Sequence, residues 1–304
     1  MPTSPRHQNA LQSVTLQAGG MNFEGFSISG VATYFRVAEL DVMFDVGECP
    51  IDMVPVNAVF LTHAHGDHSR CLLRHWQLRN MFNLPGEATY YVPENTVPGF
   101  RKIVQAEAEM EGIRAQPHQL KYPNLVGVTS GTERFKLAHR KDLWARAFAV
   151  RHRAPSLGYT IGRTVQKLRP EYAHLEGREI GALRKSGTVV TDTVDTPLVT
   201  FIGDCTGRSL GEETHIWDSK VVVIECTYVE DEDRDAALDH QHTHLREIVE
   251  VLNRNPAPAC EALILKHFSL KYNPERVHEL IWEQIPENWR DRVQILLPLP
   301  RGPR

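Results

Sequence analysis

Apolar residues alternate with polar ones over many short runs of the chain, and four longer runs have a helical period instead. In "ATYFRV" (32–37) and "LWARAFAV" (143–150), β-branched or aromatic residues recur at every second position or nearly so, which predicts strands. Further strands are expected at 40–47, 57–63, 88–93, 157–162, 197–205, 220–227, 261–268 and 292–299. Helical spacing occurs at 69–82, 94–112, 242–254 and 273–285. Strands in both halves, with helices after each group, predict a layered α/β sandwich rather than an all-β domain.

The length and composition of the chain permit one large globular domain. Its 304 residues are 41% hydrophobic and 24% charged, with no internal repeat or low-complexity linker, so a single domain over residues 1–304 is expected. The five cysteines are widely spaced and form no C-x-x-C pair, which indicates neither a disulfide framework nor a thiolate zinc site. No apolar run reaches about 18 residues, and the N-terminus lacks the pattern of a signal peptide. We therefore expect a cytoplasmic protein without a membrane segment.

Charge adds little to this picture. A formal net charge of −4 argues against a protein that coats nucleic acid indiscriminately. The segment 133–153 is locally basic, and on charge alone we interpret it as the solvated face of a strand pair. The acidic stretch 230–239 is expected to be an exposed loop without chemistry of its own.

The stretch "AVFLTHAHGDHSR" (58–70) places three histidines and an aspartate directly after an apolar run. His63 and His65 are two positions apart, so at a strand end they point to the same side and can bind one metal ion. Asp67 and His68 project differently and suit a second ion beside the first. Imidazole and carboxylate groups are ligands for zinc, with iron or manganese as alternatives. A surface loop of ordinary polar residues is the competing interpretation, and the density of the pattern argues against it.

Three later residues offer further ligands. His152, Asp204 and His267 each follow an apolar run that predicts a strand. Taken alone, each would more often be an ordinary core or surface residue. Because loops at strand ends gather into sites, their common position favours a shared metal site.

These residues resemble the motifs of the metallo-β-lactamase superfamily and, within it, of the ribonuclease Z family of tRNA 3′-processing endonucleases. The matching segments are "FDVG" (44–47), "THAHGDH" (62–68), "RHRAPSLGYTI" (151–161), "FIGDC" (201–205) and "LILKHFSLKY" (263–272). The resemblance extends from about Gly25 to Leu297. It implies an αββα sandwich of two mixed sheets flanked by helices, in which Asp45 supports the metal loop.

The resemblance also implies two zinc ions per chain, with manganese or iron possible instead. The first would be held by His63, His65, His152 and Asp204. The second would be held by Asp67, His68, His267 and Asp204, so that Asp204 bridges the two. Two adjacent cations lower the pKa of a water and neutralise charge on phosphoryl oxygens, and Asp67 could in addition take the proton of the nucleophile.

Two further segments point to the ribonuclease Z family in particular. "IECT" (224–227) and "HTH" (242–244) stand where that family has "HEAT" and "HST" segments. The resemblance implies that Glu225 and His242 act as a coupled pair, with His242 donating a proton to the leaving 3′ oxygen. His240 and His244 are competitors for this role, and their spacing does not decide among the three.

The implied substrate is precursor tRNA, cleaved to remove its 3′ trailer, and the implied assembly is a homodimer. The long Gly-Pro-rich arm that bacterial members use to grip tRNA has no counterpart here, and 167–194 looks more like the short plant cytosolic form. The segment 163–195 could form a shorter substrate-gripping insertion, since it carries six Lys and Arg residues, or an ordinary surface helical hairpin.

Two other functions remain open from the sequence. A hydrolase of the same fold could act on another small phosphodiester, a lactone or a thioester, because fold does not determine substrate. The "IECT" and "HTH" segments favour RNA. A non-catalytic binding member of the fold is disfavoured, because such a protein would be expected to have lost ligands and all seven candidates are present.

Overall fold

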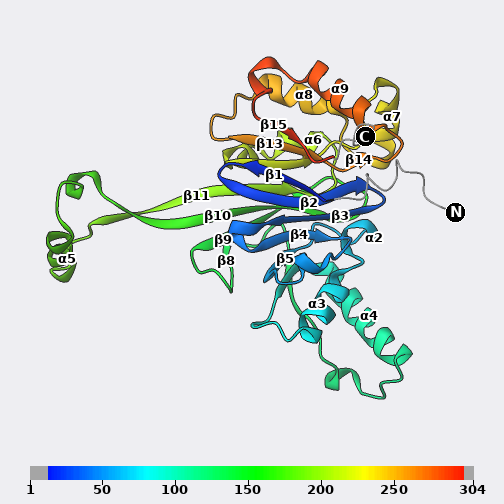
Figure 1. The fold of residues 1–304 in the computed structure, drawn as a ribbon, viewed down its shortest axis with the longest axis horizontal. Helices are drawn as coiled ribbons and strands as arrows, with labels where there is room; N and C mark the ends of the chain where they lie inside the picture. The colour runs from blue at the N-terminus through cyan, green and yellow to red at the C-terminus, as the bar shows by residue number, and fades with distance from the viewer. Residues whose placement is uncertain (1–12, 298–304) are drawn as a thin grey trace, which may run out of the picture.

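Two β-sheets stack face to face in this protein, and helices cover their outer faces (Figure 1). A computed structural model describes residues 13–297. The N-terminal stretch used to argue against a signal peptide and the last two residues of the expected strand 292–299 lie outside that range. Both sheets combine parallel and antiparallel pairs, so the predicted αββα sandwich is confirmed.

The first sheet contains strands from the N-terminal part of the chain. Within the described residues, its order is β1 (Val14–Ala18), β2 (Met21–Ser29), β3 (Ala32–Val37), β4 (Val42–Val46), β5 (Ala58–Phe60), β6 (Thr89–Pro93) and β7 (Asn124–Val128). The short β14 (Phe268–Ser269), from the C-terminal part of the chain, also pairs with β2, in parallel. The helices α3 (Leu72–Met81) and α4 (Val97–Met110) cover its outer face, packing Leu72 and Phe100 into the core (Figure 1).

The second sheet contains most of the remaining strands. Its order is β15 (Val293–Ile295), β13 (Ala262–Lys266), β12 (Val221–Glu225), β11 (Thr191–Ile202), β10 (Ser156–Leu168), β9 (Leu143–Val150) and β8 (Phe135–Lys136). The helices α8 (Leu245–Arg254) and α9 (Pro274–Gln284) cover its outer face (Figure 1). Two shorter helices, α6 (Arg208–Glu212) and α7 (Arg234–His240), follow β11 and β12.

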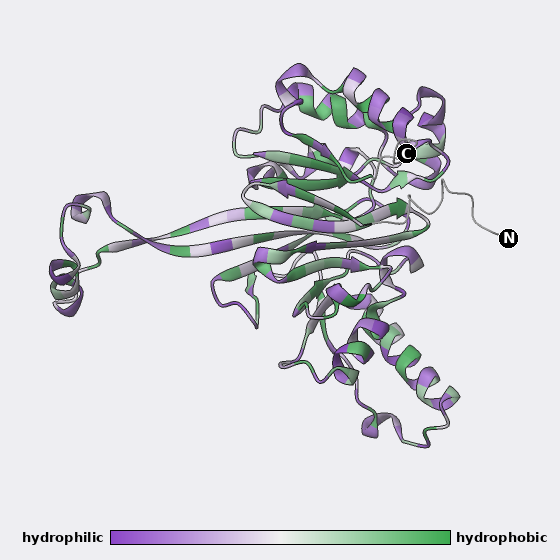
Figure 2. Ribbon diagram, in the orientation of Figure 1, coloured by the Kyte–Doolittle hydropathy of each residue, from purple (hydrophilic) through white to green (hydrophobic). Residues whose placement is uncertain are grey.

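Aromatic side chains fill the space between the sheets. The rings of Phe44 and Phe201 stack at 4.6 Å, and Phe60 meets Tyr159 edge-on at 5.2 Å. Each fully buried ring of this kind contributes on the order of 2 kcal/mol of transfer free energy. Figure 2 shows the apolar residues gathered on the strands and on the inner sides of the helices. This rigid core fixes the positions of the strand ends.

The strands β10 and β11 extend well beyond the sheet as a two-stranded arm, with α5 (Gly177–Lys185) at its tip (Figure 1). The register of β10 against β11 shifts between Ile161 and Gly162, and the arm extends beyond Arg163, the last residue of β10 that pairs with β9. A Cβ atom at Gly162 would lie 2.1 Å from Cζ2 of Trp144, so only glycine allows this close packing at the base of the arm. The helical hairpin considered for 163–195 is therefore wrong, because this segment is a strand hairpin with one helix.

Several elements differ from those expected. The acidic stretch 230–239 is not a loop: a 3₁₀ turn at Asp231–Asp233 leads into α7. Its residues Ala236, Ala237 and Leu238 favour a helix, and Ala237 is buried. The strands β1, β2, β7 and β8 were not predicted. β1, β7 and β8 lie at sheet margins, where burial is less regular and the apolar period is correspondingly weak. β2 lies inside the sheet and is largely buried, but its apolar alternation changes phase between Phe23 and Phe26, which weakens the signal.

All five thiols are free: Cys205, Cys226 and Cys260 are buried, and Cys49 and Cys71 are partly buried. Between residues 13 and 297, the helices are too short or too polar to cross a bilayer.

Candidate metal centre and active site

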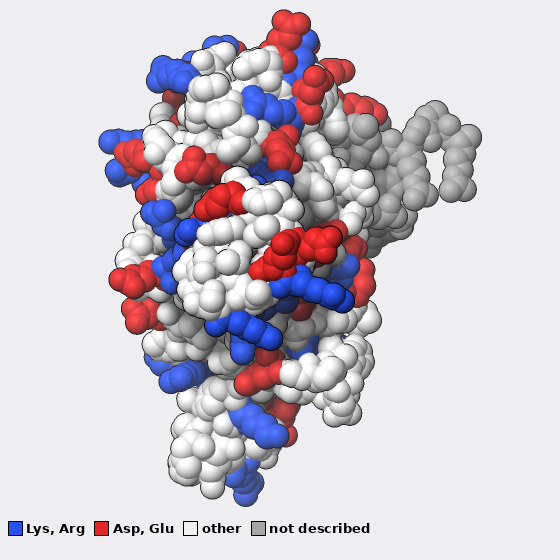
Figure 3. Space-filling model, turned by 90° about the vertical axis from the view of Figure 1, so that its left-hand side faces the viewer, with Lys and Arg blue, Asp and Glu red and all other residues white. Residues whose placement is uncertain are grey.

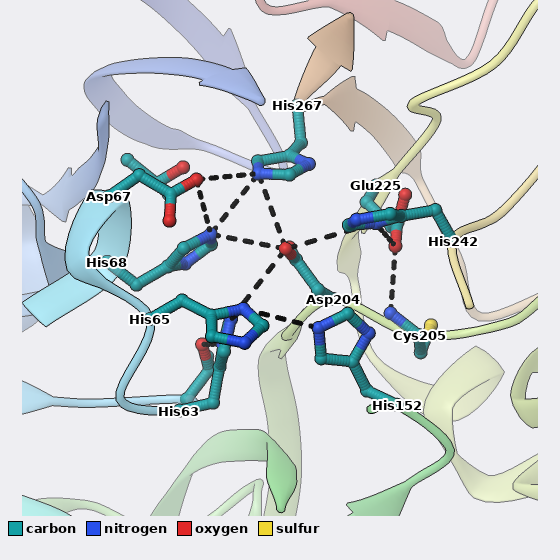
Figure 4. Close-up of polar contacts among 12 residues, drawn as sticks. His63, His65, Asp67, His68, His152, Asp204, Cys205, Glu225, His242 and His267 are labelled. Carbon is teal, nitrogen blue, oxygen red and sulfur yellow. Dashed lines mark hydrogen bonds and ion pairs between the residues drawn. The ribbon is translucent and has the colours of Figure 1, made fainter. Parts of the chain in front are cut away.

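The seven expected ligands converge at one edge of the sandwich, although they come from four separate loops (Figure 4). These loops follow β5, β9, β11 and β13, whose carboxyl ends all meet at this edge. One group, with its ligand atoms within 4.8 Å of one another, consists of His63, His65, His152 and Asp204. A second group, defined in the same way, consists of Asp67, His68 and His267.

Asp204 lies between the two groups (Figure 4). Its Oδ2 is 3.7 Å from Nε2 of His63, 3.3 Å from Nε2 of His68 and 3.4 Å from Nε2 of His267. The residue is 1% exposed, and its Oδ1 is buried without a hydrogen-bond partner. A buried carboxylate oxygen left in this state is unfavourable unless a cation or donor satisfies it.

The ring nitrogens of the cluster also approach one another closely. Nε2 of His63 is 3.0 Å from Nδ1 of His65, and Nε2 of His68 is 3.2 Å from Nε2 of His267. Five imidazoles and two carboxylates directed at a common space form the donor set that divalent transition metals bind. The residues present therefore fit a divalent metal ion.

Buried partners on the far side of the rings determine their orientation. Nδ1 of His68 donates to Oδ2 of Asp45 at 2.8 Å, while Oδ1 of Asp45 accepts from Thr62 N at 2.8 Å. Nδ1 of His152 donates to Gln241 O at 2.9 Å. In both histidines Nε2 is thereby left facing the cluster, which is how outer partners prepare metal ligands. Asp45 itself has a φ of 56°, a left-handed conformation held by these contacts.

Burial and charge set the protonation of the cluster. Burial holds the pKa of His63 well below its usual value, and burial also lowers the pKa of His65 and His267, which favours the neutral imidazole. Burial opposes the charged form of His68 as well, but the carboxylates of Asp204 and Asp45 outweigh it and raise the pKa to about 10. Burial would raise the pKa of Asp204, yet His267 and His68 hold it well below its usual range.

A second unit, formed by Glu225 and His242, lies against the cluster (Figure 4). The fully buried Glu225 accepts from Nδ1 of His242 at 2.8 Å and from Cys205 N at 2.8 Å, both at Oε1. Its Oε2 accepts from Oγ1 of Thr227, which in turn accepts from Nδ1 of His267 at 3.1 Å. One carboxylate thus connects His242 with a candidate metal ligand. Burial would lower the pKa of His242, but Glu225 outweighs it and raises the pKa to about 9.

The three histidines considered as proton donors have different surroundings. His240 is exposed, and its Nδ1 is 2.6 Å from the hydroxyl of Tyr228. His244 caps α8: its Nδ1 accepts from Arg246 N at 3.1 Å and its Nε2 donates to Glu230 O at 2.8 Å. Of the three, only His242 contacts Glu225. A ring nitrogen of His242 also lies within 4.8 Å of ligand atoms of Asp204 and His267, so it borders the cluster directly.

Comparison with known proteins places this geometry in a family. A family model described as "Beta-lactamase superfamily domain" matches residues 43–268. The chain is 32% identical to "tRNase Z TRZ1" of Arabidopsis thaliana over 88% of this chain and 91% of the relative. It is also 35% identical to "Nuclear ribonuclease Z" of Triticum aestivum over 59% of this chain and 96% of the relative. The chain belongs to the ribonuclease Z family.

Solved structures agree on the fold. The metallo-beta-lactamase fold protein YhfI of Bacillus subtilis superposes with a TM-score of 0.57 at 11% identity, covering 90% of this chain and 94% of its own. Human tRNase Z, short form, superposes with a TM-score of 0.52 at 17% identity, covering 85% of this chain and 93% of its own. At these identities the similarity concerns the fold alone.

The ribonuclease Z motifs also left some contributors to the site unnoticed. Thr62 supports Asp45, Thr227 links Glu225 with His267, and Gly30 N donates to Oδ2 of Asp67 at 2.8 Å. Thr62 and Thr227 lie inside the segments 62–68 and 224–227 that match family motifs, so their position next to ligand residues could have indicated a supporting role. Gly30 is 37 residues from Asp67 and acts through its backbone, which leaves no signal in a side-chain pattern.

Three of the seven basic residues in the segment 133–153 pair with nearby acids. Arg134 pairs with Asp195 at 2.6 Å, Arg140 with Asp142 at 2.9 Å and Arg151 with Glu212 at 2.8 Å. These partly exposed pairs contribute little to stability, and Lys136, Lys141, Arg146 and Arg153 form no ion pair within the described residues.

Proposed function

We propose that this protein is an endoribonuclease that removes the 3′ trailer from precursor tRNA by hydrolysing a phosphodiester bond. The observation that carries the proposal is the Glu225–His242 pair beside a two-group metal cluster, in a chain of the ribonuclease Z family. A cluster alone would serve many hydrolases of this fold, whereas a buried carboxylate and histidine at its edge supply the proton that an alkoxide leaving group requires.

We propose that two zinc ions per chain bind here, with manganese or iron as possible substitutes. His63, His65, His152 and Asp204 would hold one ion. Asp67, His68, His267 and Asp204 would hold the other. The position of Asp204 between the groups and its unpartnered Oδ1 support this arrangement. Bound divalent ions would supply charge neutralisation at the phosphoryl oxygens and a more acidic water.

Within this scheme the side chains divide the proton transfers. The Asp67 carboxylate accepts the proton of the attacking water. Burial would raise its pKa, but His267 and His68 outweigh burial and hold the pKa below its usual value, so the group is ionised, and its Oδ2 is held by Gly30 N. His242 donates from Nε2 to the leaving 3′ oxygen, since its Nδ1 is already bonded to Glu225. The products are tRNA with a 3′ hydroxyl and a trailer with a 5′ phosphate.

We propose that the arm at 163–195 grips the body of the tRNA, within one domain that spans residues 1–304. Its six basic residues are nearly balanced by five acidic ones. Figure 3, which looks along the arm from its tip, shows the two signs interspersed. Arg184 and Lys185, in the last turn of α5, are the phosphate contacts we favour. Family membership also supports a cytoplasmic homodimer as the working form.

The test is to incubate the zinc-loaded protein with a 3′-extended precursor tRNA and to map the cut. We expect one cut that leaves the mature 3′ hydroxyl, and a parallel assay with a chromogenic phosphodiester gives the activity toward small substrates. In this assay Asp204→Asn should abolish the cut, and its matched control Asp218→Asn, which alters an exposed acid outside the ligand groups, should cut normally. Hydrolysis of the small ester without any cut in the tRNA would instead assign the chain to small-substrate hydrolases.

A further inference from the structure

The turn between β2 and β3, residues Ser29–Val31, contacts both halves of the Asp67, His68 and His267 group. On one side, Gly30 N donates to Oδ2 of Asp67 at 2.8 Å. On the other side, β14, which begins directly after His267, runs parallel to the end of β2 and pairs Ser269 with Ser29. The turn is thus the physical link between ligands that are 200 residues apart in the sequence.

Arg70 fastens this turn to the metal loop. Its Nε donates to Gly47 O at 2.9 Å, and its terminal nitrogen donates to Val31 O. A guanidinium presents its donors in a rigid planar fork, so it can bridge two carbonyls that an ammonium group cannot bridge with the same geometry. The carboxylate of Glu48 is 3.9 Å away, and both side chains are half-exposed, so this ion pair contributes little.

The Gly47 backbone that Arg70 holds is packed directly against Asp67. A Cβ atom at Gly47 would lie 1.8 Å from Asp67 O and 2.8 Å from Thr33 N. Gly47 N in turn donates to Thr33 O at 2.8 Å, across the hairpin that carries the turn. Arg70 therefore joins three segments around one carboxylate: the loop after β4, the β2–β3 turn and the short helix α2 (Gly66–Ser69).

We propose that Arg70 is a positioning residue for Asp67: by fixing the β2–β3 turn, it holds the Gly30 N–H that orients the Asp67 carboxylate in the second ligand group. The consequence for cleavage rests on the function proposed above. Removing the Arg70 side chain loosens the Asp67, His68 and His267 group, because among the described residues that side chain donates only to Gly47 O and Val31 O. We expect the His63, His65 and His152 group to stay intact, since the His152 ring is held by Gln241 O on a separate segment. Outer partners of this kind change metal affinity about 10- to 100-fold.

The test compares Arg70→Met and Arg70→Lys with wild type, using Arg74→Met as the matched control. Arg74 is an exposed arginine one turn further along, on α3. Zinc is titrated into each metal-free protein against a chelator of known affinity. We expect one of two zinc affinities to fall about 10- to 100-fold in Arg70→Met, nearly as far in Arg70→Lys, and not at all in Arg74→Met.

Two further measurements separate positioning from general stability. Thermal unfolding of the metal-free variants reports loss of fold, and steady-state cleavage should show a lower kcat with an unchanged KM, because Asp67 acts in the chemical step. Unchanged zinc affinities in Arg70→Met, or an equal fall in both, would overturn the proposal. Because the zinc titration needs no RNA, a failure to cleave tRNA would count against the proposed function and leave the role of Arg70 to the titration.

Discussion

The strands β10 and β11 have two ends with opposite character. At one end, β10 begins four residues after His152 and β11 stops two residues before Asp204, and the residues there are buried. At the other end, the same strands become the exposed arm, where Arg169 and Asp192 pair at 2.8 Å with both side chains about a third or more exposed. The polar groups at the site are held by buried hydrogen bonds, whereas such surface pairs contribute about 0–1 kcal/mol. The site therefore depends on exact geometry, and the arm tolerates change.

At the buried end of the strands, Asp204→Asn should have the largest effect on metal binding and cleavage. Both ligand groups lose the charge they share, so we expect ion content to drop and cleavage to fall by more than about ten-thousandfold, the upper range for a single acid or base. Single-turnover cleavage of a 3′-extended tRNA and metal analysis measure the two effects. A variant that kept both ions and cut within tenfold of wild type would show that Asp204 does not join the groups.

His242→Ala should slow cleavage about 100- to 10,000-fold, because the leaving oxygen loses its proton donor. The ion content should stay at the wild-type value, as measured on the same preparations. His240→Ala is the matched control, since His240 is exposed and bonded to Tyr228. If zinc is lost together with activity, His242 belongs among the ligands, consistent with its place beside Asp204 and His267.

Removing the arm tests the exposed end of β10 and β11. Residues 164–195 would be replaced by an Asn-Gly turn between Arg163 and Thr196, which already face each other across the strand pair. We expect the KM for precursor tRNA to rise about tenfold, equivalent to roughly 1.4 kcal/mol, through the lost contacts. Turnover of a chromogenic phosphodiester should not change, because the buried ends of the strands are retained.

A milder change, Arg184→Gln with Lys185→Gln, keeps the arm and removes only charge. The slope of log affinity for tRNA against log salt concentration should become shallower, by the amount that up to two lost phosphate contacts would give. For the deletion of residues 164–195, an unchanged KM for precursor tRNA would show that a surface other than the arm holds the tRNA.

His75 provides a buried histidine outside the ligand groups, and its titration affects stability rather than cleavage. Its Nδ1 is 2.8 Å from the Tyr90 hydroxyl, and burial, followed by the charge of Arg79, lowers its pKa to about 4. Between pH 6.5 and pH 4 the unfolded chain binds a proton that the folded chain does not bind. Neutral His75 therefore contributes to the free energy of unfolding fully above pH 6.5. That contribution is lost as the pH falls toward 4, by at most about 3 kcal/mol.

His75→Gln removes that titration and should reduce the loss of stability on acidification. Urea unfolding of the metal-free proteins at pH 7 and pH 4.5 gives the difference in each case. An identical difference in the variant would show that His75 takes up its proton at an ordinary pKa in the folded protein.

The sequence by itself determined the chemistry-bearing residues and most of the elements that carry them. The H-x-H-x-D-H pattern and the ligands at later strand ends are local features, as are the apolar periods that predicted β3, β9 and α9. The family resemblance implied that Asp204 lies between the two ligand groups. Tertiary structure alone decided that His242, rather than His240 or His244, bonds Glu225 and that Gly30 N bonds Asp67. It also decided that 163–195 is a strand arm. The physical reason is that side-chain periodicity is set within a few residues, whereas strand order and register bring together distant positions such as Ser29 and Ser269.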